Sequence, residues 1–101
     1  MIIVHAVVES SRENIDAMKS AIEVMERKSR AEQGCLDYTF SVELHQPEVV
    51  RITERWESLD ALTAHFQQPH MADFRAAMTE HPPVSVTAQF FEANEIPSPL
   101  T

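Results

Sequence analysis

The chain has 101 residues, of which 44% are hydrophobic, and it contains one cysteine and one glycine. This length predicts a single domain, and the composition is typical of a globular fold. Sixteen acidic residues against eight basic ones give a formal charge of −8, which disfavours nucleic acid and anionic membrane surfaces as partners. No apolar run approaches the ~20 residues of a membrane span, and the first residues carry no export signal, so we expect a cytoplasmic protein.

The first two predicted elements are a strand and a long amphipathic helix. Residues 2–8 are almost continuously apolar, which is typical of a strand in the centre of a sheet. Ser10, followed by Glu13 three residues later, predicts a capping box at the start of a helix. We expect this helix to be about 20 residues long and Gly34 to cap its end. Its predicted buried face carries four apolar residues at helical spacing: Ile15, Met18, Ile22 and Met25.

A hairpin is predicted next, over two strands with alternating apolar and polar residues. Residues 36–44 alternate with the period of a half-buried strand, and a polar turn follows at residues 45–48. In the second strand, Glu54 shares one predicted face with Ile52 and Trp56. A carboxyl group on a buried face requires a partner or a position beside a pocket.

The second half of the chain predicts a broken helix and a last strand. Ser58 is a predicted helix cap, Pro69 interrupts the helix, and the residues after it continue as a second short helix. His81-Pro82-Pro83 ends this segment, and residues 84–92 alternate as a strand. We therefore expect one domain over residues 1–93 and an extended C-terminal tail over residues 94–101.

These elements predict an α+β fold with the ferredoxin-like order β-α-β-β-α-β, in which helices cover one face of an antiparallel sheet. The other face has no covering element, and it is expected to carry Ile3, Val7 and Phe91 among threonines. A mixed apolar and polar face of this kind requires a partner, and a second copy related by a two-fold axis is the simplest one. The sequence therefore predicts a homodimer.

Three separated motifs resemble one known family. They are G-C-L-x-Y from Gly34, E-x-W-x-S-L-D-A-L from Glu54, and H-F-Q-Q-P-H-M-x-x-F from His65. They are similar to the antibiotic biosynthesis monooxygenase (ABM) family, in particular its small quinol-monooxygenase-like branch. The resemblance implies a dimeric α+β barrel with a pocket between sheet and helices in each subunit. It also implies oxygenation of quinols or phenols without flavin, haem or metal, although other members degrade haem or isomerise a small sugar phosphate.

Oxygenation without a cofactor requires a base, because the anion of a phenol, quinol or enol gives an electron to O2 more readily than the neutral compound. Histidine suits this role, and His65 and His70 correspond to the two histidines of the family motif. We expect His65 to be the base because it lies on the helix face that carries Leu62. Alternatively, either histidine caps a helix or bonds a carbonyl at the break.

Glu54 is the third predicted catalytic residue, and it would orient a histidine or bind a substrate hydroxyl. Alternatively, Glu54 forms a salt bridge with an arginine such as Arg51 or Arg75. The residues expected to bind substrate are aromatic: Tyr38, Trp56, Phe66 and Phe74.

We expect no cofactor and no metal. A single glycine excludes the glycine-rich loops that bind nucleotides, and the two histidines have neither i, i+4 spacing nor an evident third ligand. The sequence thus predicts a cofactor-independent monooxygenase acting with O2 on a small quinol, phenol or enol. A non-catalytic small-molecule-binding or stress-response module and an isomerase of a small oxygenated metabolite are the alternatives.

Overall fold

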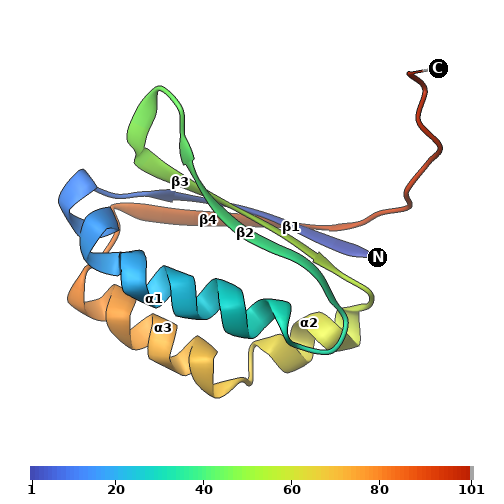
Figure 1. Cartoon of the computed structure of the whole chain (residues 1–101), viewed down its shortest axis with the longest axis horizontal. Coiled ribbons are helices and arrows are strands. Elements are labelled where there is room, and N and C mark those ends of the chain that lie inside the picture. Colours follow the sequence, from blue (N-terminus) through green and yellow to red (C-terminus); the bar gives the residue numbers. More distant parts are fainter. Residues whose placement is uncertain (101) are drawn as a thin grey trace.

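The computed structural model describes residues 1–100 and consists of a four-stranded antiparallel sheet with three helices against one of its faces (Figure 1). The strand order is β2-β3-β1-β4. The predicted ferredoxin-like arrangement is confirmed, with its second helix divided in two. The elements are β1 (Ile2–Glu9), α1 (Arg12–Arg30), β2 (Cys35–Glu43), β3 (Gln46–Trp56), α2 (Leu59–His65), α3 (Pro69–Glu80) and β4 (Ser85–Glu92).

β1 lies between β3 and β4, as its apolar sequence predicted. Alternate residues of this strand, Ile2, Val4 and Ala6, are buried on the face that the helices cover. Ile2 and Val4 join a cluster of buried side chains from α1, α2 and the neighbouring strands, namely Met25, Tyr38, Trp56 and Leu62. This cluster fixes the helices on the sheet near the N-terminal end of β1.

α1 begins and ends at other residues than the sequence predicted. Its N-cap is Ser11, whose side chain accepts a hydrogen bond from the Asn14 amide, so the predicted capping box of Ser10 and Glu13 is wrong by one residue. The backbone amide of Ser10 instead donates to the Glu48 carbonyl. The C-cap is Ala31 rather than Gly34.

Gly34 has its role in the turn that leads from α1 into β2. Its φ of +85° lies in the left-handed region that favours glycine. A Cβ added there would lie 2.6 Å from the Cβ of Ala61, which no ordinary contact tolerates. The single glycine of the chain therefore permits both the turn and the close approach of α2.

The hairpin of β2 and β3 is present, but its apolar alternation is not fully buried. A register irregularity between Cys35 and Asp37 leaves Leu36 45% exposed, and Leu44 falls in the turn with 86% exposure. Tyr38 is buried and Phe40 is half-buried on the inner face. The prediction that the whole stretch from Leu36 to Leu44 forms one buried face is therefore wrong at both ends.

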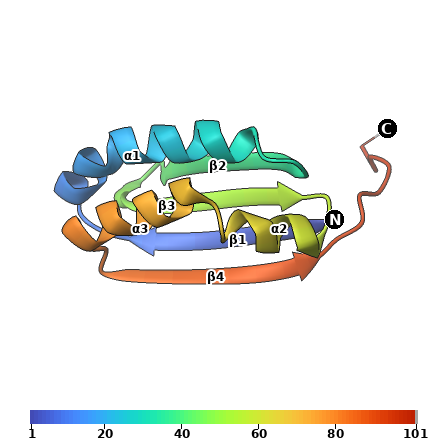
Figure 2. The same ribbon diagram turned by 90° about the horizontal axis from the view of Figure 1, so that it is seen from below.

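The helix break lies where proline predicted it. Ser58 caps α2 by accepting from the Ala61 amide, and Pro69 occupies the first turn of α3, where a missing N–H costs no helical hydrogen bond. The connection between the two helices spans only residues 66–68. Figure 2, which looks from below, shows α2 and α3 in succession in front of the sheet, with α1 beside them.

The outer face of the sheet is uncovered in the chain itself (Figure 1). On this face Ile3 pairs with Phe91 and Val7 pairs with Thr87, as the sequence predicted, and Phe91 is 45% exposed. Residues 94–100 form neither helix nor strand, and Thr101 of the predicted tail lies outside the described residues. Across residues 1–100, none of the three helices combines the length and apolar character needed to cross a bilayer.

Candidate functional site

A cavity of about 180 Å³ lies between α1, α3 and the inner face of the sheet. Its walls are mainly apolar, because α1 contributes methionines and isoleucines and α3 contributes methionines and a phenylalanine to its lining. The side chains that form most of this wall are Ile15, Met18, Ile22, Phe40, Met71, Phe74 and Met78. An apolar engineered cavity of ~150 Å³ holds benzene, so this cavity has room for a small aromatic molecule.

Glu54 is the only carboxylate among the residues that line the cavity. Its Oε1 accepts a hydrogen bond of 2.9 Å from Nε1 of Trp56, while Oε2 has no hydrogen-bond partner among residues 1–100. Only 8% of the residue is exposed, and this burial raises the pKa of Glu54 above its ordinary value, with the Trp56 N–H opposing the rise. A carboxylate with a raised pKa and one free oxygen can accept a proton from a bound ligand.

The sequence offered a salt bridge with Arg51 or Arg75 as an alternative role for Glu54, and this salt bridge is absent among the described residues. Arg51 pairs with Glu43 on the hairpin at 3.0 Å. Arg75 lines the cavity, but its guanidinium donates to the carbonyl of Phe66 at 3.3 Å. Among the described residues, no cation thus forms a salt bridge with Glu54 to offset the burial that disfavours its ionised form.

Tyr38 also lines the cavity, beside Glu54 in the adjacent strand, where the two residues are paired across the sheet. Burial raises the pKa of the Tyr38 phenol far above its usual range, with the charge of Glu54 adding to the rise. The hydroxyl therefore stays protonated and is suited to donating a hydrogen bond. The opposite end of the cavity is polar, with Ser10, Asn14 and His81 among its lining residues.

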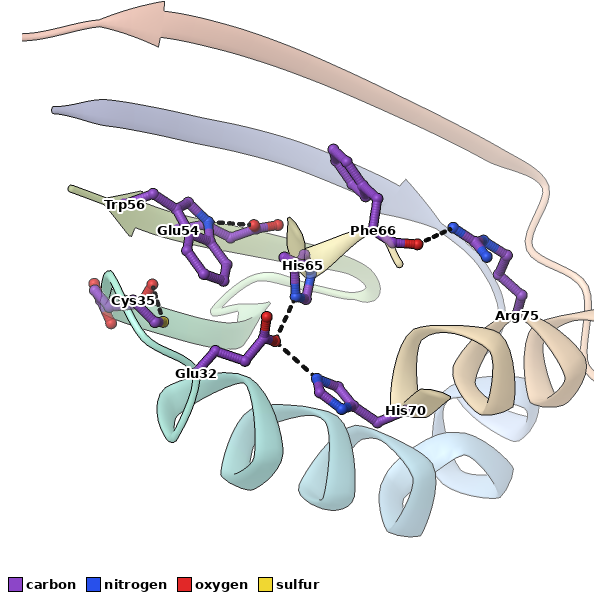
Figure 3. A network of polar contacts seen from close by, with 9 residues as sticks. Glu32, Cys35, Glu54, Trp56, His65, Phe66, His70 and Arg75 are labelled. Atoms are coloured by element: carbon purple, nitrogen blue, oxygen red, sulfur yellow. Dashed lines mark hydrogen bonds and ion pairs between the residues drawn. The ribbon is translucent and has the colours of Figure 1, made fainter. Parts of the chain in front are cut away.

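The two predicted catalytic histidines do not line the cavity; they meet Glu32 instead (Figure 3). Oε2 of Glu32 lies 2.7 Å from Nδ1 of His65 and 2.8 Å from Nε2 of His70. Because a carboxylate only accepts, both imidazoles donate to it. Nε2 of His65 is buried with no partner among the described residues, and burial lowers the pKa of His65, so this ring is neutral at physiological pH.

Two of the four predicted substrate-binding aromatics, Tyr38 and Phe74, line the cavity, and the other two do not. Trp56 is fully buried behind it, with its indole 4.8 Å from the His65 ring between centroids. Phe66 is the C-cap of α2 and is 37% exposed. Glu54, Tyr38 and Phe74 thus line the cavity together, whereas His65, His70 and Phe66 lie outside its lining.

Glu32 and the polar end of the cavity were not predicted from the sequence. Glu32 follows the end of α1, in a stretch without periodicity, and joins His65 and His70 across 33 and 38 positions in sequence. A candidate third ligand, which was not evident in the sequence, therefore stands beside the two histidines. Arg75, which the sequence offered only as a salt-bridge partner, is a lining residue.

Comparison with known proteins gives one family and many similar folds. Residues 1–77 match the family model described as antibiotic biosynthesis monooxygenase. A crystal structure from Deinococcus radiodurans, provisionally described as such an enzyme, is similar at 27% identity with a TM-score of 0.90, and all of both chains is covered. A Caulobacter crescentus structure with the same provisional description shares the fold at 22% identity and a TM-score of 0.86, covering 93% of this chain and 90% of its own. No match is found among curated proteins.

Proposed function

The chain belongs to the antibiotic biosynthesis monooxygenase family, and from that membership we propose that it oxygenates a small phenol, quinol or enol inside the cavity described above. The observation that carries the proposal is one buried carboxylate, Glu54, in an otherwise largely apolar chamber. An apolar chamber suits an electron-rich aromatic substrate and excludes water from its reactive intermediates. No flavin, haem or metal takes part in the proposed reaction.

The proposed reaction starts with removal of a phenolic proton by Oε2 of Glu54. The resulting anion gives one electron to O2, and the substrate radical and superoxide then combine to form a carbon–oxygen bond. Loss of the hydrogen on that carbon and cleavage of the O–O bond release one water molecule, for which Glu54 returns the proton. The substrate gains one oxygen atom and loses two hydrogens, and the second oxygen atom of O2 leaves as water.

Glu54 is a better base here than an exposed carboxylate would be, because its raised pKa narrows the gap to a phenol, whose own pKa is ~10. The Trp56 N–H holds Oε1 in place and leaves Oε2 for the substrate. In the proposed reaction Tyr38, which also lines the cavity, donates a hydrogen bond to the developing phenolate or to a quinone oxygen. His65 and His70, which the sequence favoured as bases, are engaged with Glu32 outside the cavity wall, so we transfer this role to Glu54.

The isomerase alternative fits the cavity less well. A phosphorylated sugar requires polar walls and cationic anchors, whereas this cavity is largely apolar and contains an anionic residue. Its only arginine, Arg75, already donates to a backbone carbonyl. A non-catalytic binding module would use the same apolar walls, and the experiment below separates it from an enzyme.

We also propose that the working unit is a homodimer in which two sheets pack through their outer faces. The outer face carries Ile3, Val7 and Phe91, and the ring of Phe91 contacts His5 with 5.9 Å between centroids. At the adjoining edge, every residue of β4 is exposed in the single chain. A stable interface of this kind buries roughly 2,000 Å² or more in total.

Oxygen uptake with a panel of hydroquinones, naphthoquinols and simple phenols tests the proposed function. We expect at least one compound to be consumed with one O2 per molecule, and ¹⁸O2 to place one labelled atom in the product. The protein should be assayed after dialysis against chelator and with its absorption spectrum checked for flavin and haem. Binding of panel compounds without oxygen uptake above autoxidation would instead indicate a binding module.

A further inference from the structure

The cluster of Glu32, His65 and His70 contains three metal-ligating groups that the proposed reaction does not use. Their ligand atoms all lie within 4.8 Å of one another, and both imidazole contacts meet at Oε2 of Glu32. Each group comes from a different element: Glu32 follows α1, His65 is the last residue of α2, and His70 is the second residue of α3. Figure 3 shows the carboxylate between the two rings.

The donor set selects a class of ion. Two imidazole nitrogens and one carboxylate oxygen suit borderline divalent ions such as Zn²⁺ and Co²⁺, whereas Mg²⁺ and Ca²⁺ prefer oxygen alone. Bonds of ~2.1 Å from one ion hold its donor atoms roughly 3.0–3.4 Å apart. The present N···O distances of 2.7 and 2.8 Å would therefore have to widen by a few tenths of an ångström, and the two imidazole nitrogens, which lie within 4.8 Å of each other, would have to close to the same spacing.

We propose that Glu32, His65 and His70 form a binding site for one zinc-class divalent ion, which joins the ends of α1, α2 and α3. An open dent in the surface gives access, because Glu32 and His70 are lining residues and their side chains are 9% and 8% exposed. Gln68 also lines this dent. Water completes the coordination on the open side.

Some nearby charges favour a cation at this site and others oppose it, which limits the expected affinity for the ion. The C-terminal ends of α1 and α2 and the charge of −8 on the chain favour a cation, while Lys28 at the dent and Arg75 oppose it. Coordination through Nδ1 places the proton of His65 on Nε2, which is buried with no partner among the described residues. This unpaired buried N–H weakens binding, and we expect micromolar rather than nanomolar affinity.

The proposed ion site is separate from the oxygenation cavity. Tyr38 lines the cavity on one side and packs edge-on against His65 on the other, with 5.2 Å between ring centroids. An ion at Glu32 therefore stands behind Tyr38 and does not contact a molecule in the cavity. The proposed function of the ion is to fix the three-residue connection between α2 and α3. If no ion binds at this site, the proposed oxygenation in the cavity is unaffected.

Titration of the chelator-treated protein with Co²⁺ and Zn²⁺ tests the site. We expect one Co²⁺ per chain with visible d–d absorption, displacement by Zn²⁺, and a rise of Tm with either ion. Glu32→Gln and His70→Gln keep groups that can hydrogen-bond at these positions but lose a ligand, so we expect each to weaken binding ~100-fold or more while the metal-free Tm changes little.

His45→Ala is the matched control, because His45 is an exposed histidine in the turn between β2 and β3, and its loss should leave binding unchanged. Absence of d–d absorption and of a Tm rise in the wild-type chain would overturn the proposal. Binding that persists in both Glu32→Gln and His70→Gln would overturn it as well, since the ion would then lie elsewhere on the surface.

Discussion

Replacing Trp56 with phenylalanine tests the environment of Glu54 without touching its carboxylate. The indole N–H of Trp56 donates a buried hydrogen bond of 2.9 Å to Oε1 of Glu54. A hydrogen bond to a charged group contributes ~1.5–3 kcal/mol, against ~0.5–1.5 kcal/mol for a bond between neutral groups. The free energy lost in Trp56→Phe should therefore be larger by about 1 kcal/mol when Glu54 is ionised than when it is protonated.

The sign follows from the raised pKa of Glu54. Its protonated form is favoured in the fold, so its contribution to stability is present at low pH and is lost as the pH rises through that raised pKa. Removal of the Trp56 donor raises the pKa further and enlarges the loss. We expect Trp56→Phe to lower Tm more at about pH 8 than at about pH 5, by roughly 4–8 °C for each 1 kcal/mol.

Thermal unfolding of four proteins measures this effect: wild type, Trp56→Phe, Glu54→Gln and the double variant. The loss of packing around residue 56 is common to both pH values and cancels in the comparison. In the Glu54→Gln background the pH-dependent part should vanish, because no carboxyl group remains there to titrate. An equal Tm loss at both pH values in the wild-type background would refute our account of Glu54.

Three further predictions concern the cavity, the dimer and the turn. Ile22→Trp should fill the cavity and weaken binding of an aromatic ligand at least ~10-fold in calorimetry, with the fold kept by circular dichroism; unchanged affinity would place the ligand elsewhere. Phe91→Glu should convert the dimer into monomers, as measured by light scattering. If the wild-type chain is itself an 11.5 kDa monomer, the proposed dimer is wrong. Gly34→Ala should cost ~2 kcal/mol or more in urea unfolding, because φ is +85° and the new Cβ meets Ala61 at 2.6 Å, while Gln33→Ala should cost little.

The sequence predicted the order of the elements and the direction of Glu54 because both depend on short periods. Alternation in β3 places Glu54 on the same face as Ile52 and Trp56 wherever the strand lies in the sheet. The proline at position 69 likewise predicts a helix break from local chemistry alone. The start of α1 was missed because serines at positions 10 and 11 compete for the cap, and only the tertiary contact of Ser10 with Glu48 decides between them.

Which residues meet at the site depends on tertiary contacts that no local sequence pattern encodes. Helical periodicity correctly predicted that His65 points inward, and it is fully buried, but periodicity does not say which part of the sheet an inward residue meets. α2 lies over the buried cluster around Trp56, beside the cavity rather than above it. Glu32 could not be predicted as the partner of His65 and His70, because these contacts form only when the end of α1 packs against the break between α2 and α3.

The most direct test of the central claim is the turnover of Glu54→Gln with the best substrate of the panel. The amide keeps the shape of the side chain and its acceptor for Trp56, but it cannot take a proton. We expect kcat/KM for oxygen uptake to fall ~100-fold to 10,000-fold, with the Kd of the substrate nearly unchanged. The exposed Glu80→Gln at the end of α3 should behave as wild type. Wild-type rates of oxygen uptake in Glu54→Gln would contradict the account, because the proton would then be removed by another group or by water.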